Sequence, residues 1–322
     1  MLSVSQLTRR FGHFTAVDTV NFTIDKGSIV GLLGHNGAGK TTVMKMISGF
    51  LEPTRGSIVL NGEDLLQDPK KIHRVLGYLP ENSPLYPELK VFDYLNFIAS
   101  VRGIPKPERP RQVKSALEAT DVLDRAFSPI QSLSRGLKQR VGVAQAILGE
   151  PDVVILDEPT NGLDPEQTLH MRDLIKRLGE RATVLLSTHI MQEVEAICDQ
   201  VLIMRNGKLI VNDSLAALQS NHHLTIATSA ARGELEKIID GVGQAASIKL
   251  LDSVEEDGKK RIYKAQLERS LPQSQADEII SKLASALIAA NHGIYQLATE
   301  KRDLETIFKE VGEGVEVVDH AA

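Results

Sequence analysis

The sequence predicts an α/β protein in which helices cover both faces of a mainly parallel sheet, followed by a smaller α+β domain. The first observation is a set of short apolar runs with little alternation, as expected for strands buried on both faces. The second is a change of pattern near residue 220, after which strands and helices recur in the order βαββαβ. A chain of 322 residues is long enough for two such domains. The apolar runs are Ser28 to Leu33, Ser57 to Leu60, Val153 to Leu156 and Thr183 to Leu186.

Composition and charge argue against a nucleic-acid-binding, a membrane-spanning and a secreted protein. The net charge of −5 speaks against nucleic-acid binding, because neutralising phosphates requires a basic surface. No segment approaches the roughly 18 apolar residues that cross a bilayer, and the N-terminus lacks the apolar core of a secretory signal. We therefore expect a cytoplasmic protein whose single cysteine, Cys198, is a core residue.

One βαβ unit is well marked in the first domain, for which we predict residues 1–220. Asp164 and Pro165 are expected at the N-cap and first position of a helix, and Gly179 at its end. The strand Thr183 to Ser187 follows and completes the unit. The predicted apolar stripe of this helix is Met171, Leu174, Ile175 and Leu178.

Residues 84–149 are predicted to form a helical lobe inserted into the first domain. Apolar residues at helical spacing begin at Val91, and three prolines between Ile104 and Pro110 indicate a loop between two helices. Leu85 and Tyr86, at the start of the lobe, leave two possibilities open. They form a surface that a membrane partner covers, or a turn packed on the lobe itself.

The second domain is predicted for residues 221–314, with a tail at 315–322. Its expected strands are Leu224 to Thr228, Ser247 to Leu251, Arg261 to Leu267 and Ile294 to Ala298. Its expected helices lie around Leu235, from about Pro272 to Gly293, and near Leu304 to Phe308. This order predicts a small ferredoxin-like sandwich.

A glycine-rich segment, GHNGAGKT at Gly34 to Thr41, follows a predicted strand and precedes a helical run. Its backbone can wrap around a triphosphate, so that the amides of the loop and of the helix N-terminus face the β-phosphate. Lys40 then brings a positive charge to the β- and γ-phosphates, and Thr41 a hydroxyl to Mg²⁺. The sequence therefore predicts a site for ATP and Mg²⁺. Its loop residues are Gly34, Asn36, Gly37, Ala38, Gly39, Lys40 and Thr41.

Two acidic residues end the apolar strand Val153 to Leu156. Asp157 stands where a carboxylate can meet a metal ion held by the threonine of the glycine loop. Glu158 is the predicted general base, which polarises the water that attacks the γ-phosphate. The alternative is that the two acids only cap a turn before Pro159. The neighbouring motifs favour the catalytic role over this structural one.

Residues Leu133 to Arg140, read LSRGLKQR, lie between these two motifs. Together the three motifs resemble the ATP-binding subunit of ABC transporters over roughly the first two-thirds of the chain. The resemblance implies a P-loop NTPase fold with an inserted helical lobe, and a homodimer that closes around nucleotide. Ser134, Gly136 and Gln139 of one copy would then face the γ-phosphate bound by the other. The alternative for Ser134 is an ordinary N-cap of its own helix.

The resemblance also implies roles for single residues. His189, in Leu-Ser-Thr-His, would be the switch histidine at the γ-phosphate, and Thr42 would bond the α-phosphate. Asp164 would line the dimer seam while capping its own helix. Phe11 would stack on adenine, with a core position as the alternative. Glu81 stands where the family usually has Gln, and it can still coordinate Mg²⁺ or orient water, although it adds negative charge beside the phosphates.

We therefore expect an ATP-hydrolysing subunit, peripheral on the inner face of the cell membrane, that drives a separate integral-membrane permease. The short lobe and the extra C-terminal domain are similar to exporter-type subunits, including those called gliding-motility or multidrug ATP-binding proteins. The alternative is a soluble ABC ATPase acting on ribosomes or DNA. Such proteins carry two cassettes or long coiled coils, whereas this chain has one cassette and no sustained heptads.

Overall fold

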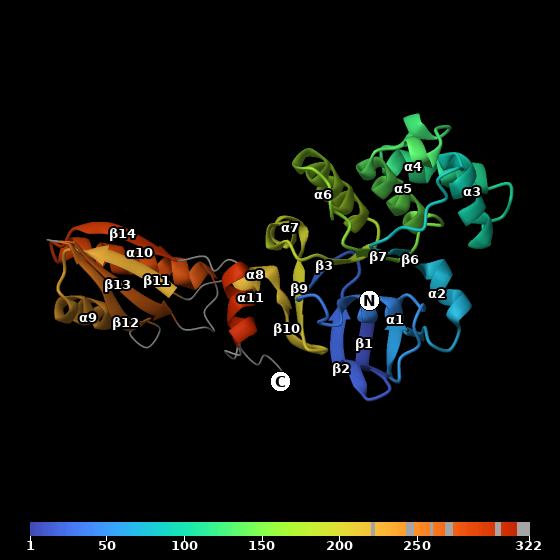
Figure 1. Cartoon of the computed structure of the whole chain (residues 1–322). Helices are drawn as coiled ribbons and strands as arrows, with labels where there is room; N and C mark the ends of the chain where they lie inside the picture. The colour runs from blue at the N-terminus through green and yellow to red at the C-terminus, as the bar shows by residue number, and fades with distance from the viewer. Residues whose placement is uncertain (220–222, 243–247, 258–259, 268–272, 300–303, 314–322) are drawn as a thin grey trace. The chain divides into compact units, whose positions relative to one another are not determined.

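The structure, a computed structural model, describes residues 1–219, 223–242, 248–257, 260–267, 273–299 and 304–313 (Figure 1). The chain divides into two compact units, and the second of them is Ala216–Ile307. The first unit is Met1–Leu215 together with residues 308–313. The boundary predicted after residue 220 falls at 220–222, outside the described residues, whereas the structural division lies at Leu215.

The first unit is built on a six-stranded sheet of order β10-β9-β3-β8-β7-β6. All neighbouring strands run parallel except β10 and β9, which form an antiparallel edge. Every residue of β3, β6, β7 and β8 is buried, which accounts for their continuous apolar sequences. The strands are β3 (Ile29–Leu33), β6 (Leu76–Leu79), β7 (Val153–Asp157), β8 (Thr183–Ser187), β9 (Gln200–Arg205) and β10 (Lys208–Ser214).

A second sheet of the first unit, of order β2-β1-β4-β5, is antiparallel throughout. The prediction that Ser57 to Leu60 belongs to the helix-covered parallel sheet is wrong, because this strand pairs with β1. Only Ile58 and Leu60 of this segment are fully buried, as expected for a strand with one face on the core. The strands are β1 (Leu2–Phe11), β2 (Phe14–Ile24), β4 (Arg55–Leu60) and β5 (Glu63–Asp64).

Helix α1 (Lys40–Ile47) lies between the two sheets of the first unit (Figure 1). Its buried side chains belong to one apolar cluster with residues of both sheets. Burying one such side chain contributes about 1.5–3 kcal/mol, so the helix is firmly held. Because α1 follows the glycine-rich segment directly, this packing also fixes that segment at the carboxyl end of β3. The buried residues of α1 in the cluster are Val43, Met44, Met46 and Ile47.

Helices α6 (Pro165–Gly179) and α7 (Met191–Ile197) cover the opposite face of the six-stranded sheet (Figure 1). As predicted, Asp164 caps α6, and its Oδ1 accepts a hydrogen bond from the Gln167 amide at 2.8 Å. Gly179 ends the helix in helical rather than left-handed backbone. A Cβ at Gly179 would lie 2.7 Å from the side chain of Ile29, so close packing explains the glycine. The predicted stripe is buried, at Met171, Leu174, Ile175 and Leu178.

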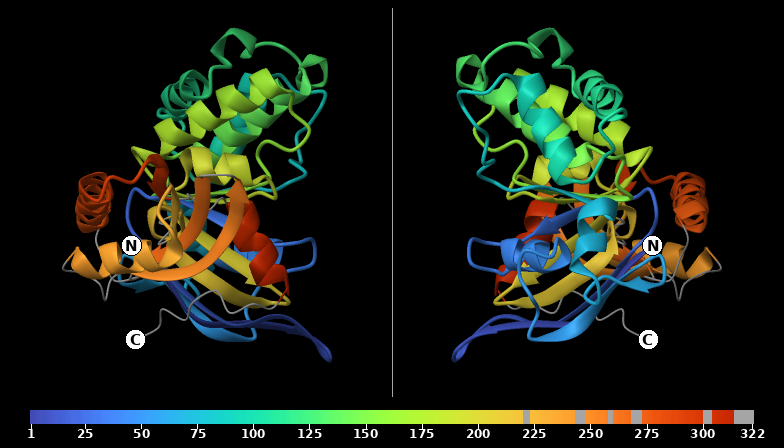
Figure 2. Two further views of the ribbon diagram at one scale, coloured as in Figure 1. Left: turned by 90° about the vertical axis from the view of Figure 1, so that its left-hand side faces the viewer. Right: turned by 90° about the vertical axis from the view of Figure 1, so that its right-hand side faces the viewer.

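The predicted lobe forms a separate helical cluster with its own apolar core. Figure 2 shows the green lobe helices on the opposite side of the central sheet from the blue antiparallel strands. Leu85 is partly buried and packs on the lobe, as one of the two possibilities predicts, whereas Tyr86 is 45% exposed. The helices are α3 (Val91–Val101), α4 (Arg109–Ala119) and α5 (Arg135–Ile147), with short 3-10 turns at Leu123–Arg125 and Ile130–Ser132. Helix α2 (Pro69–Val75) precedes β6.

The second unit contains a four-stranded antiparallel sheet of order β12-β13-β11-β14. Its elements follow the predicted βαββαβ chain order, and both helices pack on the sheet through one apolar cluster. The elements are β11 (His223–Thr228), α9 (Arg232–Gly241), β12 (Ile248–Asp257), β13 (Lys260–Leu267), α10 (Gln273–Ala289) and β14 (Ile294–Thr299). Helices α8 (Leu215–Gln219) and α11 (Leu304–Glu313) flank these elements in the chain. The predicted tail at 315–322 lies outside the described residues.

Gly77 of β6 provides a test of how the lobe packs on the sheet. A Cβ at this position would lie 1.9 Å from the carbonyl oxygen of Ala146 in α5. We expect Gly77→Ala to lower the free energy of unfolding by about 3 kcal/mol, since the backbone of α5 would have to move. Urea unfolding measures this change. In the control Gly233→Ala, the new methyl group meets no described atom within 4 Å. An equally small effect in both variants would contradict the packing.

Candidate functional site

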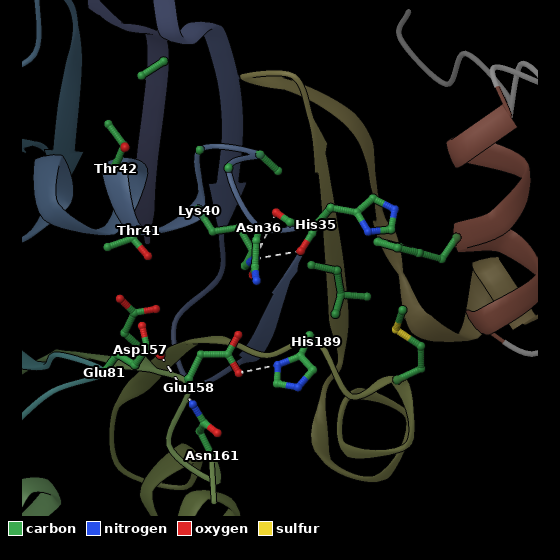
Figure 3. A pocket seen from close by; sticks show the side chains of 18 of the residues that line it. His35, Asn36, Lys40, Thr41, Thr42, Glu81, Asp157, Glu158, Asn161 and His189 are labelled. Carbon is green, nitrogen blue, oxygen red and sulfur yellow. Dashed lines mark hydrogen bonds and ion pairs between the residues drawn. The ribbon is translucent and has the colours of Figure 1, made fainter. Parts of the chain in front are cut away.

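A cavity of about 790 Å³ opens at the carboxyl ends of β3 and β7, around the start of α1 (Figure 3). Ligands of open α/β sheets bind at this edge. The cavity brings together the predicted loop residues, both acids and the predicted switch histidine, whereas Ser134, Gly136, Gln139 and Asp164 do not line it. The predicted residues that line it are Phe11, Gly34, Asn36, Gly37, Ala38, Gly39, Lys40, Thr41, Thr42, Glu81, Asp157, Glu158 and His189.

The loop from Gly34 to Gly39 connects β3 to α1 in a conformation that depends on glycine. Gly37 and Gly39 have φ of 82° and 106°, in the left-handed region that side chains disfavour. Gly39 occupies the N-cap of α1 and offers no side chain to the first amides of the helix. Those amides lack intrahelical partners, and they lie at the positive end of the helix dipole. The loop is therefore a preformed site for an anion such as phosphate.

Lys40 is buried at the centre of the cavity. Its Nζ donates a hydrogen bond to the Gly34 carbonyl oxygen at 2.6 Å. Burial lowers the pKa of this ammonium, and the negative charges of Glu158, Asp157 and Glu81 partly offset that effect. The side-chain nitrogen of Lys40 thus lies within reach of the loop that would receive the phosphates.

The two acids at the end of β7 are held by Ser187, which ends the neighbouring strand β8. Ser187 Oγ donates to Asp157 Oδ1 at 2.5 Å. The Glu158 amide donates to Ser187 Oγ at 3.0 Å and to the Ser187 carbonyl oxygen at 3.2 Å. Burial, and then the charge of Asp157, raises the pKa of Tyr78 in β6, so the phenol beside the acids keeps its proton.

Glu158 and His189 contact each other directly. Glu158 has φ of 50°, a conformation uncommon for glutamate, at the point where the chain leaves β7. Its Oε2 lies 2.9 Å from His189 Nδ1, and Figure 3 shows this contact facing the cavity. The predicted base and the predicted switch histidine thus form an acid–base pair, a contact that the sequence did not predict.

Thr41, Glu81 and Asp157 direct oxygen atoms into one part of the cavity (Figure 3). Hydroxyl and carboxylate oxygens suit Mg²⁺, which is usually held by one or two carboxylates together with water and substrate phosphates. Among the described residues, no cluster of three or more His, Cys, Asp or Glu could hold a metal ion. The hydroxyl of Thr41 and the carboxylates of Glu81 and Asp157 fit an Mg²⁺ ion shared with a phosphate ligand. Glu81 Oε1 also accepts a hydrogen bond from Asn161 Nδ2 at 3.4 Å.

Phe11 and Phe14 are among the aromatic residues that line the cavity. Phe11 is 46% exposed, so the core position considered for it is wrong, and the guanidinium of Arg9 lies 4.6 Å from its ring centroid. Phe14, which pairs with Phe11 across the turn between β1 and β2, is 64% exposed. Exposed rings of this kind offer a surface on which a planar base can stack.

The segment Leu133 to Arg140 lies outside the cavity of its own copy. Ser134 is exposed and caps α5, its Oγ accepting from the Leu137 amide at 3.3 Å. Gly136 is buried, and a Cβ there would lie 2.2 Å from Gln167 Oε1 in α6. The alternative considered for Ser134, an N-cap of its own helix, is therefore confirmed, and Gly136 packs on α6 within the same copy. The exposure of Ser134 nevertheless leaves this segment accessible to a second molecule.

Sequence comparison identifies the family. The profile of the family described as ABC transporter matches residues 17–161. The chain is 36% identical over 236 residues to the uncharacterized ABC transporter ATP-binding protein YxlF of Bacillus subtilis (strain 168). The aligned region covers 73% of this chain and 78% of that protein. This chain is an ABC transporter ATP-binding protein.

Two other comparisons extend the assignment of this ABC transporter ATP-binding protein. The linearmycin resistance ATP-binding protein LnrL of Bacillus subtilis (strain 168) is 27% identical over 311 residues, 96% of this chain and 97% of that protein. A solved structure described as the ATP-binding subunit of an ABC transporter has a TM-score of 0.61 and 34% identity, and covers 68% of this chain and 92% of that one. The predicted P-loop NTPase fold, ATP binding and ATPase activity are confirmed.

Sequence reasoning missed Phe14, Asn161 and Ser187. For Ser187 a signal existed, because it ends the strand after the acidic strand, and parallel neighbours bring their carboxyl ends to one edge. Phe14 was signalled only by its nearness to Phe11 across a short turn. Asn161 follows the acidic pair by a few residues, and only the folded loop brings it to Glu81.

Replacing Lys40 tests the loop. We expect Lys40→Ala to weaken ATP binding by about 10- to 100-fold, because charge-assisted hydrogen bonds to phosphate are lost. Titration with a fluorescent ATP analogue measures the affinity. Lys45→Ala, an exposed lysine of the same helix outside the cavity, is the matched control and should bind as the wild type does. Unchanged binding by Lys40→Ala would contradict the assignment of the loop.

Proposed function

We propose that this protein is the ATPase subunit of an exporter-type ABC transporter and acts as a homodimer beneath a separate integral-membrane permease. One observation carries the proposal: the cavity contains the phosphate loop and both acids, whereas the exposed Ser134 segment lies outside it. A second copy can therefore supply what the cavity of a single copy lacks.

In the proposed complex, the loop amides and Lys40 hold the β- and γ-phosphates of ATP, and Thr42 bonds the α-phosphate. The adenine stacks on Phe11, with Phe14 beside it. Thr41, Asp157 and Glu81 hold Mg²⁺, which neutralises phosphate charge when it is bound. The hydroxyl donated by Ser187 keeps the Asp157 carboxylate in place for this task.

Hydrolysis is assigned to Glu158 as general base. Its carboxylate takes a proton from a water molecule, the water oxygen forms a bond to the γ-phosphorus, and the bond to the bridging oxygen of ADP breaks. His189 orients the carboxylate through the contact with Oε2 and reaches the γ-phosphate with its exposed ring. Lys40 and the loop amides stabilise the charge that develops on the phosphate oxygens.

Dimer closure is assigned to the N-terminus of α5. Ser134 Oγ and the free amides of this helix face the γ-phosphate bound by the other copy, with Gly136 and Gln139 behind them. Asp164 lines the same seam. ATP binding then joins the copies and hydrolysis releases them, and this motion drives the permease.

The permease contact is assigned to the aromatic surface of the lobe around Tyr86. The ring of Tyr86 lies 6.0 Å from that of Phe97, and both side chains are about half exposed. Exposed apolar surface of this kind is often covered by a partner. This contact would place the protein on the inner face of the membrane. The name of LnrL, a resistance protein similar over nearly the whole chain, supports export as the direction.

The dimer is tested with Glu158→Gln. We expect this variant to bind ATP, to lose turnover by about 100-fold or more because the base is gone, and to remain trapped as a dimer. Size-exclusion chromatography with light scattering measures the mass with and without ATP. Adding Ser134→Arg places a bulky cation at the proposed seam and should return the variant to a monomer. A monomer at every ATP concentration in the Glu158→Gln variant itself would contradict the dimer.

The permease is tested by purifying the tagged chain from detergent-solubilised membranes. We expect an integral-membrane protein to co-purify, and Tyr86→Ser with Phe97→Ser to reduce its recovery about tenfold through loss of apolar contact. Phe127→Ser, at another exposed aromatic residue of the lobe, is the control. Recovery of ribosomal or DNA-associated proteins alone would favour the soluble ATPase instead.

A further inference from the structure

Glu193 of α7 is an acid placed where acids are rarely found. Glu193 is buried, with only 1% of the residue exposed. Its Oε2 accepts hydrogen bonds from Thr160 Oγ1 at 2.7 Å and from Thr188 Oγ1 at 2.9 Å, while Oε1 has no hydrogen-bond partner among the described residues. A buried carboxylate that is only half satisfied is costly for the fold, so its presence requires an explanation.

The two threonines belong to the two loops that carry the proposed catalytic pair. Thr160 lies two residues after Glu158, in the loop that leaves β7. Thr188 lies between Ser187 and His189, in the loop that leaves β8. Both threonines are buried, and Glu193 does not line the cavity. Glu193 therefore connects these loops from behind, without touching the space that nucleotide would occupy.

Each loop continues from its threonine to another part of the site. The carbonyl oxygen of Asn161, next to Thr160, accepts a hydrogen bond from Arg135 Nη2 at 2.8 Å, and its side chain donates to Glu81. Thr188 Oγ1 also accepts from the Ile190 amide at 3.1 Å, which defines the turn that presents His189. A change at Glu193 would therefore reach the start of α5 through one loop and the Glu158–His189 contact through the other.

We propose that Glu193 is a positioning residue that holds the Glu158 loop and the His189 loop in one mutual arrangement. A carboxylate suits this task because it only accepts hydrogen bonds. One of its oxygens can accept from both threonine hydroxyls, and the carboxylate itself has no proton that would need an acceptor. The inference rests on the proposed roles of Glu158 and His189, and it adds that their alignment is set by a residue outside the cavity.

The test uses the purified full chain and measures kcat, KM and ATP affinity for Glu193→Leu and Thr188→Val. Leucine removes the acceptor at similar volume, and valine removes one donor. We expect kcat to fall by about tenfold or more, with ATP affinity within about twofold of the wild type, because the glycine loop and Lys40 are unchanged. Glu193→Gln keeps an accepting oxygen and should recover most of the rate.

Two further variants separate positioning from general stability. Thr120→Val removes a buried hydroxyl whose hydrogen bonds in the described part of the chain go to the carbonyl oxygens of Ala116 and Leu117, within the lobe, and should leave kcat unchanged. Adding Thr188→Val to Glu193→Leu should reduce kcat no further, since both changes break the same network. Multiplying effects in the combined variant would contradict a shared role.

Thermal unfolding is recorded for every variant. If kcat of folded Thr188→Val and Glu193→Leu equals the wild-type value well below the unfolding midpoint, Glu193 has only a structural role and the inference is overturned. If Glu193→Leu does not fold, the kcat of Thr188→Val decides. A wild-type chain that hydrolyses no ATP would overturn the proposed function itself, and this inference with it.

Discussion

The parallel pairing of β7 with β8 is the constraint on which the site depends. Its register sets Asp157 opposite Ser187. The serine hydroxyl can therefore donate to the Asp157 carboxylate and accept from the backbone amide of Glu158. Because parallel strands end at the same edge of the sheet, Glu158 and His189 leave it side by side. The same edge receives the glycine loop, since β3 pairs with β8 on its other side. A shift of one residue in either pairing would separate the acids from the loop.

The charges of the cavity are arranged for a ligand that is itself highly negative. Lys40 faces three carboxylates, and the positive end of α1 lies beside it. Glu81, where the family usually has a neutral amide, makes this surrounding more acidic. A triphosphate would therefore enter most favourably with a divalent cation, since its own charge would otherwise meet Asp157 and Glu81 at close range.

Features encoded within one segment could be predicted from the sequence. The glycine loop, the acidic pair, the Asp164 cap and the chain order of the second unit depend on neighbouring residues or on local spacing. The assignment of Ser57 to Leu60 to the central sheet failed, because four apolar residues are too few to distinguish a strand covered on one face from one covered on both. Ser187, Asn161, Glu193 and the contact of Gly136 with Gln167 depend on segments far apart in sequence. No local pattern signals them, apart from the position of Ser187 at the end of the strand that follows the acidic strand.

The separation of Ser134 from the cavity of its own copy has a genetic consequence. In the proposed dimer each composite site takes its loop from one chain and its helix end from the other. A chain defective in Lys40 and a chain defective in Ser134 would each be inactive alone. Mixed together, they would rebuild one intact site per heterodimer, so two null alleles of this gene could complement each other within one cell.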